Sequence, residues 1–301
     1  MFVGYTYTFA SVIVNKYSSF TKGEFNELYD KTTILIEIKA RVIVLLVCLK
    51  VDCICAKIIV NTKTSSKMLN LASLTDTTNY EIYLVNKGAT AQNFWCFLEK
   101  PEGVSSSEVY ANSSAMLSVL PNYQGINKFT IPLQYMLAAG ASNEAVGLNV
   151  QIDSAIMKNA SLTQTWEAKY ATAPPPQGPT LQLDQGVSSP GGTLAIKSND
   201  FNQVQNENNS WFSNMSFGIQ TAQGFVGVTW KPGPNQTSTI TPKFSFYIAT
   251  GSYTSNSLAD MATISSTSAA VSLSDFQNLK ATVTLDSTGK WYVTPGKPSM
   301  S

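Results

Sequence analysis

Aromatic side chains late in the chain are the residues whose types and spacing could do chemistry. Trp211, Trp230 and Tyr247 fall in neighbouring segments of alternating sequence, and flat rings on adjacent strands can form a platform that binds sugars. Tyr253 and Asp260 follow and would add a hydroxyl and a carboxylate to this candidate ligand-binding site. Packing inside the protein is the alternative role for these rings, because Trp is highly buried on average.

Carboxylates offer a second chemistry, because a pair of Asp or Glu residues can hydrolyse glycosidic bonds. The acids after residue 67 are scattered, however, and none lies in a recognisable catalytic context. Asp153, Asp184, Asp200 and Asp260 stand at the ends of expected strands, where turn-forming Asp is common and calcium binding would be unspecific. The sequence therefore identifies no catalytic residue and no metal site.

The composition excludes several other functions. The chain has no His, and its only Arg is Arg41, so it lacks a Ser-His-Asp relay, an imidazole metal ligand and, after residue 41, a bidentate guanidinium. Its net charge is +1, and charged residues make up only 13% of the chain, which argues against nucleic acid as a partner. There is no Gly-rich phosphate loop and no CxxC pair, so we expect no cofactor.

Three of the four cysteines, Cys48, Cys53 and Cys55, lie near the N-terminus, which leaves Cys96 alone in the rest of the chain. Cys96 stands between aromatic residues in QNFWCFLE, and no His or Arg is at hand to lower its pKa. We therefore expect a buried, inert thiol rather than a nucleophile.

Three runs between Ser210 and Tyr253 alternate apolar with small or polar residues. The apolar positions are Met215, Phe217 and Ile219, then Val226, Val228 and Trp230, then Phe244, Phe246 and Ile248. A period of two with Gly, Pro and Asn between the runs is typical of antiparallel strands with one buried face. Weaker patterns precede them at Asn79–Asn86, Gln92–Glu99, Ala115–Leu120, Phe129–Leu137, Val146–Ile152 and Thr163–Tyr170.

The fold class is therefore predicted to be all-β. Residues 75–296 should form an antiparallel β-sandwich, either jelly-roll-like or two packed sheets, within a domain spanning 68–301. Gln92–Glu99 is apolar on both faces and should be a central strand, whereas Pro132 indicates an edge or a bulge, and Thr163–Tyr170 reads as a long exposed strand. The Pro-rich stretch 171–179 would join two subdomains or cross between two sheets. The side chains expected to be buried are Trp95, Phe97, Phe217, Val228, Phe246 and Val283.

Residues 1–67 differ from the rest and are predicted to be an extension outside the core. The segment Thr33–Val60 is apolar but interrupted by charges, and its longest clean run, Val42–Leu49, is far short of the roughly 20 residues of a transmembrane span. Three interpretations remain open: a misassigned start with Met68 as the initiator, an unusual targeting or anchor segment, or an extra element packed on the body. Cytosolic and exported locations both remain open as well.

The segment GIQTAQGFVGVTWKPGPNQTSTITPKFSFYIATGSYTSNSLAD, together with YLVNKGATAQNFWCFLEKPE, resembles the RhiA family of rhizosphere-expressed proteins. The shared features are an Asn after the first strand, a Gly-rich strand pair, a Pro-Asn loop, a Thr-Pro segment and an aromatic strand followed by Gly and Asp. In this chain the Gly-rich pair includes Gly218, the loop is Pro234-Asn235 and the Thr-Pro segment is Thr241-Pro242. The aromatic strand contains Phe246-Tyr247 and is followed by Gly251 and Asp260. The likeness spans residues 78–295. The family's Ser-Leu-Ala-Trp element appears only as Met116–Val119, without the Trp. The resemblance implies a small all-β protein and supplies no catalytic residue.

These observations lead to a non-enzymatic binding or structural β-protein as the expected function. A carbohydrate-binding module, or a carboxylate-dependent enzyme acting on a sugar or secondary metabolite, is the alternative. The partner could be a carbohydrate, another protein or a second copy of the chain. Five sequons begin at Asn112, Asn159, Asn208, Asn214 and Asn235, but Asn, Ser and Thr are so abundant that such matches are expected by chance.

Overall fold

The protein is described by a computed structural model that covers residues 78–123, 125–152, 154–171 and 178–299, together with three short strands nearer the N-terminus. The chain divides into two compact units, Met1–Ser73 and Leu74–Ser301. In the first unit, β1 (Ile38–Lys39), β2 (Val42–Leu45) and β3 (Ile58–Ile59) pair antiparallel. The rest of segment 1–67 lies outside the described residues. The three interpretations of this segment therefore stay open.

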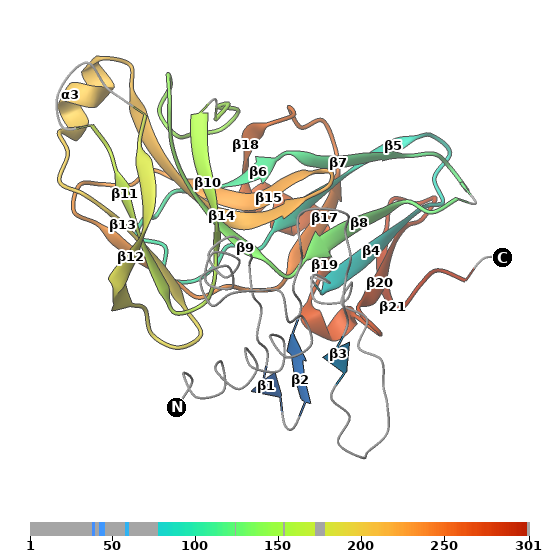
Figure 1. Cartoon of the computed structure of the whole chain (residues 1–301). Helices are drawn as coiled ribbons and strands as arrows, with labels where there is room; N and C mark the ends of the chain where they lie inside the picture. The colour runs from blue at the N-terminus through green and yellow to red at the C-terminus, as the bar shows by residue number, and fades with distance from the viewer. Residues whose placement is uncertain are drawn as a thin grey trace, which may run out of the picture. The chain divides into compact units, whose positions relative to one another are not determined.

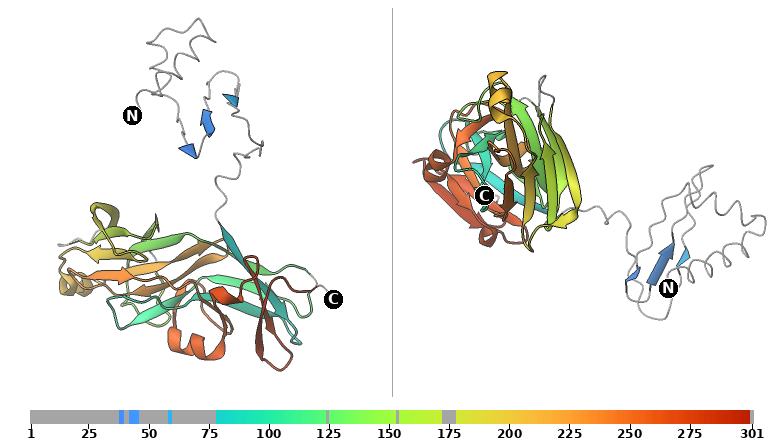
Figure 2. Two further views of the ribbon diagram at one scale, coloured as in Figure 1. Left: turned by 90° about the horizontal axis from the view of Figure 1, so that it is seen from below. Right: turned by 90° about the vertical axis from the view of Figure 1, so that its left-hand side faces the viewer.

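The second unit is an all-β sandwich, as predicted, and its strands stack in layers (Figures 1 and 2). Its largest sheet has six strands in the order β10-β9-β14-β15-β6-β18, and every neighbouring pair is antiparallel. In chain order these strands are β6 (Val109–Ser113), β9 (Tyr135–Ser142), β10 (Ser154–Ala160), β14 (Phe212–Thr221), β15 (Gly224–Trp230) and β18 (Ser257–Asp260).

Three four-stranded sheets complete the unit, in the orders β12-β11-β13-β16, β19-β17-β5-β7 and β21-β20-β4-β8. Two of their pairings are parallel, β11 with β13 and β20 with β4. Their strands are β4 (Asn79–Asn86), β5 (Gln92–Leu98), β7 (Ala115–Val119), β8 (Lys128–Pro132), β11 (Gln164–Lys169), β12 (Thr180–Ser188), β13 (Leu194–Ser198), β16 (Thr237–Ile240), β17 (Phe246–Thr250), β19 (Ala269–Val271), β20 (Lys280–Leu285) and β21 (Trp291–Pro295). Short helices are α3 (Gln203–Asn208), α4 (Met261–Thr267) and the 3₁₀ turn η2 (Leu273–Asp275).

One hydrophobic core takes side chains from all four of these sheets. All six side chains predicted to be buried are inaccessible or nearly so: Trp95, Phe97, Phe217, Val228, Phe246 and Val283. The central position of β5 is also confirmed, since it lies between β17 and β7. Its Phe94, Cys96 and Leu98 belong to the main core, whereas Trp95 and Phe97 face a second cluster that includes Ile264 of α4.

The chain crosses from one sheet to another at two places where consecutive strands belong to different sheets. These crossings connect the sheets at the corners of the sandwich. The chain leaves the six-stranded sheet at the end of β6 and continues after Ser114 as β7 beside β5. It returns through β8 and β9, which are separated by Leu133 and Gln134 just after Pro132. β8 is an edge strand, as expected for a strand that ends in Pro.

Three expectations need correction. Val146–Ile152 is a loop rather than a strand, because it meets β18 only through an isolated bridge between Gln151 and Ser257 and backbone hydrogen bonds to Leu258. Trp166 in β11 is buried, and β11 is flanked by β12 and β13, so this strand is not exposed. The strands before and after 171–179 pair with each other, so the stretch joins neighbours in one sheet. The segment before Ser210, for which no element was predicted, contains α3, and its N-cap Asn202 accepts a hydrogen bond from the Gln205 N–H.

Removing residues 1–67 should leave the stability of the sandwich unchanged. The segment Leu74–Ser301 is a compact unit by itself, and among the described residues its buried core begins at Ile82. A chain beginning at Met68 is therefore expected to melt cooperatively at the same temperature as the full chain by circular dichroism. Insolubility, or a melt many degrees lower, would show that the extension belongs to the domain.

Cys96 should resist alkylation in the native protein. Its thiol is fully buried and unpaired, and burial raises its pKa well above the usual range, so almost no thiolate exists to react. Peptide mapping after iodoacetamide treatment should find Cys96 unmodified in buffer and modified in guanidinium. Modification in buffer at the rate of a free thiol would contradict the buried position.

Candidate functional site

The outer face of the six-stranded sheet is lined with small and polar side chains. The inner positions of β14 and β15 carry Met215, Phe217 and Ile219 opposite Trp230, Val228 and Val226. The residues between them therefore point away from the core, because side chains alternate along a strand. On this outer face lie Ser216, Gly218, Gly227 and Thr229, joined by Asn112 of β6 through a hydrogen bond to Thr229.

A loop of residues 143–152, which we call the crossing loop, covers this outer face. It leaves the sheet at β9 and re-enters it at β10, yet between them it reaches the far edge strand β18. There the Leu258 N–H donates to the Val150 carbonyl at 3.1 Å, and the Asn149 N–H donates to the Leu258 carbonyl at 2.8 Å. Val146 and Val150 pack against Leu258, so the crossing loop is anchored by apolar contacts as well as by backbone hydrogen bonds.

A cavity of about 360 Å³ lies between the crossing loop and the sheet. This volume is near the lower end of the range of roughly 300–1,000 Å³ found for small-molecule sites. None of its lining residues carries a charge: they are Asn112, Ser114, Ala138, Gln151, Ile152, Met157, Ser216, Phe225 and Asn256. Three carboxamides and two hydroxyls therefore share the wall with apolar groups.

Phe225 forms an aromatic wall because two glycines leave space for its ring. Gly218 and Gly227 face each other across β14 and β15. A Cβ atom added to Gly227 would lie 2.4 Å from the Phe225 ring and 2.6 Å from the Phe217 carbonyl oxygen, and one added to Gly218 would meet the same ring at 2.6 Å. The half-buried ring therefore lies on the glycine pair, a position that only residues without a Cβ permit.

A chain of hydrogen bonds fixes which cavity groups remain available. The Thr229 hydroxyl donates to Asn112 Oδ1 at 3.1 Å, so its single proton is used. Ser216 Oγ, 2.7 Å away, must then donate to Thr229 and keep its lone pairs. Within the described residues Asn112 Nδ2 has no hydrogen-bond partner. The cavity thus offers an N–H donor on β6 and a hydroxyl acceptor on β14.

Asn214 lies two residues before Ser216 on the same strand, which places it on the same face. Its side chain is fully buried, and neither Oδ1 nor Nδ2 finds a partner in the described part of the chain. Burial without a hydrogen bond costs about 1–3 kcal/mol for such a group. The outer face therefore carries two carboxamides with unused hydrogen-bonding groups, those of Asn112 and Asn214. Asn214 is fully buried and Asn112 lies in the cavity wall, so neither sequon presents its amide on the outer surface of the protein.

The expected aromatic platform is not formed. Trp230 is fully buried opposite Met215, so its ring belongs to the core. Trp211 precedes β14 and is partly buried, with its ring edge-on to Tyr170 at 6.0 Å between centroids. Tyr247 lies in β17, in a different sheet. The alternation already places Trp230 with Val226 and Val228 on the apolar face, whereas the pocket opens on the opposite face.

The remaining candidates gather near α4. Tyr253 lies edge-on to Phe97 at 5.0 Å, and burial raises its pKa and that of Tyr247. Asp260 caps α4 by accepting from the Thr263 side chain and N–H, both at 2.7 Å, and these bonds lower its pKa. Tyr247 also lines an open hollow of about 570 Å³ with Lys243.

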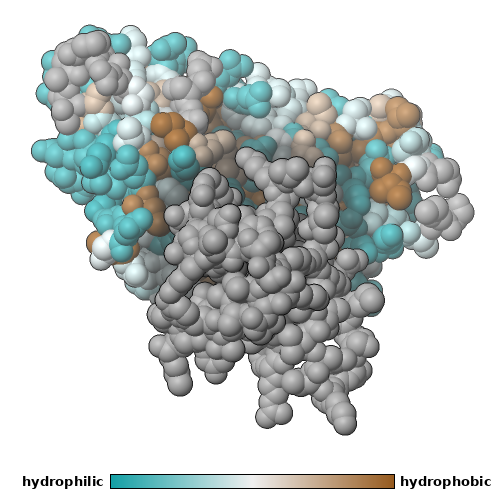
Figure 3. Space-filling view, viewed as in Figure 1, coloured by the Kyte–Doolittle hydropathy of each residue, from teal (hydrophilic) through white to brown (hydrophobic). Residues whose placement is uncertain are grey.

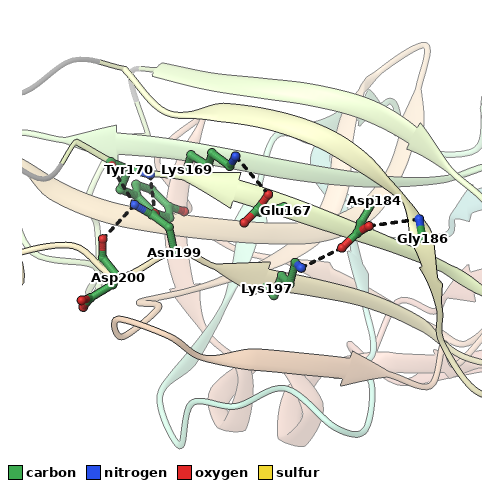
Figure 4. Close-up of polar contacts among 8 residues, drawn as sticks. All are labelled: Glu167, Lys169, Tyr170, Asp184, Gly186, Lys197, Asn199 and Asp200. Carbon is green, nitrogen blue, oxygen red and sulfur yellow. Dashed lines mark hydrogen bonds and ion pairs between the residues drawn. The ribbon is translucent and has the colours of Figure 1, made fainter.

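Several charged side chains that face solvent are paired with one another. On the sheet of β11, β12 and β13, Lys197 Nζ lies 2.7 Å from Asp184, and Lys169 Nζ lies 3.3 Å from Glu167 (Figure 4). The hydrogen bond from Lys197 is the main cause of a lowered pKa at Asp184. Beside the open hollow, Lys243 bonds Glu99 at 3.2 Å and Glu102 at 3.3 Å. Asp200 lies beside Asn199 (Figure 4), and Asp153 is outside the described residues.

No protein-family model, no curated protein and no solved structure matches this chain. Within the described ranges, no helix is long and apolar enough to span a bilayer. The same residues contain no group of three Asp, Glu, His or Cys side chains suited to a metal ion.

Proposed function

We propose that this protein is a non-catalytic binding protein whose cavity under the crossing loop takes a small, neutral, polyhydroxylated ligand such as a sugar. The observation that carries the proposal is the uncharged lining of three carboxamides, two hydroxyls and one aromatic ring. Carboxamides and hydroxyls match neutral hydroxyl groups, while the Phe225 ring offers an apolar face for the C–H side of a sugar ring. Membership of the RhiA family remains part of this proposal.

The alternative function, a carboxylate-dependent enzyme, is less well supported by the pKa values of the carboxyl groups. A general acid needs a raised pKa, but the carboxyls with a clear shift all have a lowered one: Glu81, Asp184, Glu207, Asp260 and Asp286. None of these acids lines the cavity. The available geometry therefore favours binding over acid–base hydrolysis.

A glycan array on the full chain, followed by titration calorimetry of the best glycan, tests the proposal. Asn112→Asp places a charge in the neutral cavity without changing its shape, and it should weaken binding by about tenfold or more, equal to 1.4 kcal/mol. Asn159→Asp is the matched control, because Asn159 of β10 is exposed and does not line the cavity, and this variant should bind normally. Equal affinity for both variants, or turnover of the glycan that one carboxylate-to-amide change abolishes, would overturn the proposal.

The affinity of the cavity for its ligand should be independent of pH. No side chain that titrates lines the cavity, so the dissociation constant is expected to vary less than about twofold between pH 5 and pH 9. A carboxylate-dependent enzyme would instead give a bell-shaped profile in its turnover. Calorimetry across this range distinguishes the two, and a strong loss of binding on acidification would count against the proposed site.

A further inference from the structure

The loop between β7 and β8 presents three large apolar side chains to solvent. Leu120 and Tyr123 are each 55% exposed and Ile126 is 61% exposed, and we call these three residues the apolar tip. They lie within seven residues of one another on one loop. Figure 3 shows hydrophobic residues at this end of the molecule, at the right of the view.

The base of the loop is held by Asn86, whose side chain is buried. Its Nδ2 donates to the Val119 carbonyl at 2.9 Å and to the Thr90 carbonyl at 2.8 Å, while its Oδ1 accepts from the Gly88 N–H at 2.9 Å. The Asn86 carbonyl also accepts from the Asn122 N–H. The apolar tip is therefore presented on a fixed base, which reduces the entropy that binding must remove.

Two lysines lie at the same end of the sandwich as the apolar tip. Lys87 follows Asn86 directly, and its N–H donates to the Leu285 carbonyl, which brings the β20–β21 hairpin and its Lys290 to this end. Both lysines are exposed and form no ion pair with any described residue. Lys290 Nζ lies 5.2 Å from the centroid of the Tyr292 ring. Apolar residues with a Tyr, together with exposed lysines at the same end, match the layered chemistry of a lipid interface.

We propose that the apolar tip inserts into the interfacial region of a lipid bilayer and holds the protein at a membrane surface. The exposed lysines Lys87 and Lys290 at the same end favour a lipid surface over a protein partner, because lipid phosphate groups lie in the layer next to the apolar region. The net charge of the whole chain is only +1, so apolar insertion rather than long-range attraction supplies the binding. The lysines add contacts to phosphate groups in the same layer.

Sedimentation of the full chain with phosphatidylcholine vesicles, with and without phosphatidylserine, tests this proposal. Wild type should bind both kinds of vesicle, and Ile126→Ser or Leu120→Ser/Ile126→Ser should lose about tenfold or more of the binding. Val204→Ser is the matched control, because Val204 is 69% exposed on α3 at the other end of the sandwich (Figure 1). It should bind like wild type.

All variants keep residues 1–67, so that the apolar run Val42–Leu49 contributes equally to each. Absence of vesicle binding by wild type, or equal binding by the tip variants, would overturn the proposal. Gel filtration gives the competing outcome: if wild type self-associates and Ile126→Ser does not, the apolar tip contacts a second copy of the chain instead. Circular dichroism confirms that each exposed substitution leaves the fold intact.

Discussion

The Phe217→Ala variant is expected to lose about 3–5 kcal/mol of its free energy of unfolding. Phe217 is fully buried at the centre of β14, between Leu137 of β9 and Val228 of β15. Its ring also packs against that of Tyr135 at 5.5 Å. Removing it leaves a cavity where the six-stranded sheet meets the rest of the core, and the paired strands on both sides limit relaxation.

Urea titration followed by circular dichroism measures this loss. Val204→Ala on α3 is the control, because a mostly exposed side chain should change stability by no more than about 0.5 kcal/mol. A loss below about 1 kcal/mol for Phe217→Ala would mean that β14 does not lie at the centre of the core.

The second large effect is expected at Gly227, where even one methyl group has no space. The added Cβ would lie 2.6 Å from the Phe217 carbonyl oxygen and 2.4 Å from the Phe225 ring. The oxygen belongs to the paired strand and moves only if the pairing is disturbed. Gly227→Ala should therefore cost about 1–3 kcal/mol of stability, and it should displace the aromatic wall of the cavity.

Gly191→Ala is the matched control, since a Cβ there meets nothing within 4 Å. Thermal melts of the two variants should differ clearly, with Gly191→Ala close to wild type. Equal melting temperatures would show that β14 and β15 are further apart than described, and the position assigned to Phe225 would then be wrong.

The inner faces of the central strands could be predicted from sequence because one buried face imposes a period of two. Met215, Phe217 and Ile219 followed this rule, and QNFWCFLE was recognised as a central strand because both of its faces are apolar. The valines of the crossing loop gave a similar pattern for another reason. Val146 and Val150 are buried by contact with Leu258, and a loop that buries apolar side chains produces the same signal as a strand.

The candidate site could not be predicted, because it depends on contacts between distant segments. Gly218, Gly227 and Phe225 were visible in the sequence, but only the register of β14 with β15 shows that the ring covers the glycine pair. Asn112 reaches Thr229 across 117 positions of the chain. Trp230 was predicted to bind a ligand because of its residue type. Its place in the alternation nevertheless assigns it to the apolar face.

Titration calorimetry of Phe225→Ala with the best glycan from the array tests the central claim most directly. Phe225 is half-buried in the cavity wall and outside the hydrophobic core, so its removal should alter binding more than folding. We predict that affinity falls by about tenfold or more, while Trp211→Ala, at the alternative aromatic site, binds like wild type. Unchanged affinity in Phe225→Ala, with binding abolished in Trp211→Ala, would contradict the assignment of the cavity under the crossing loop.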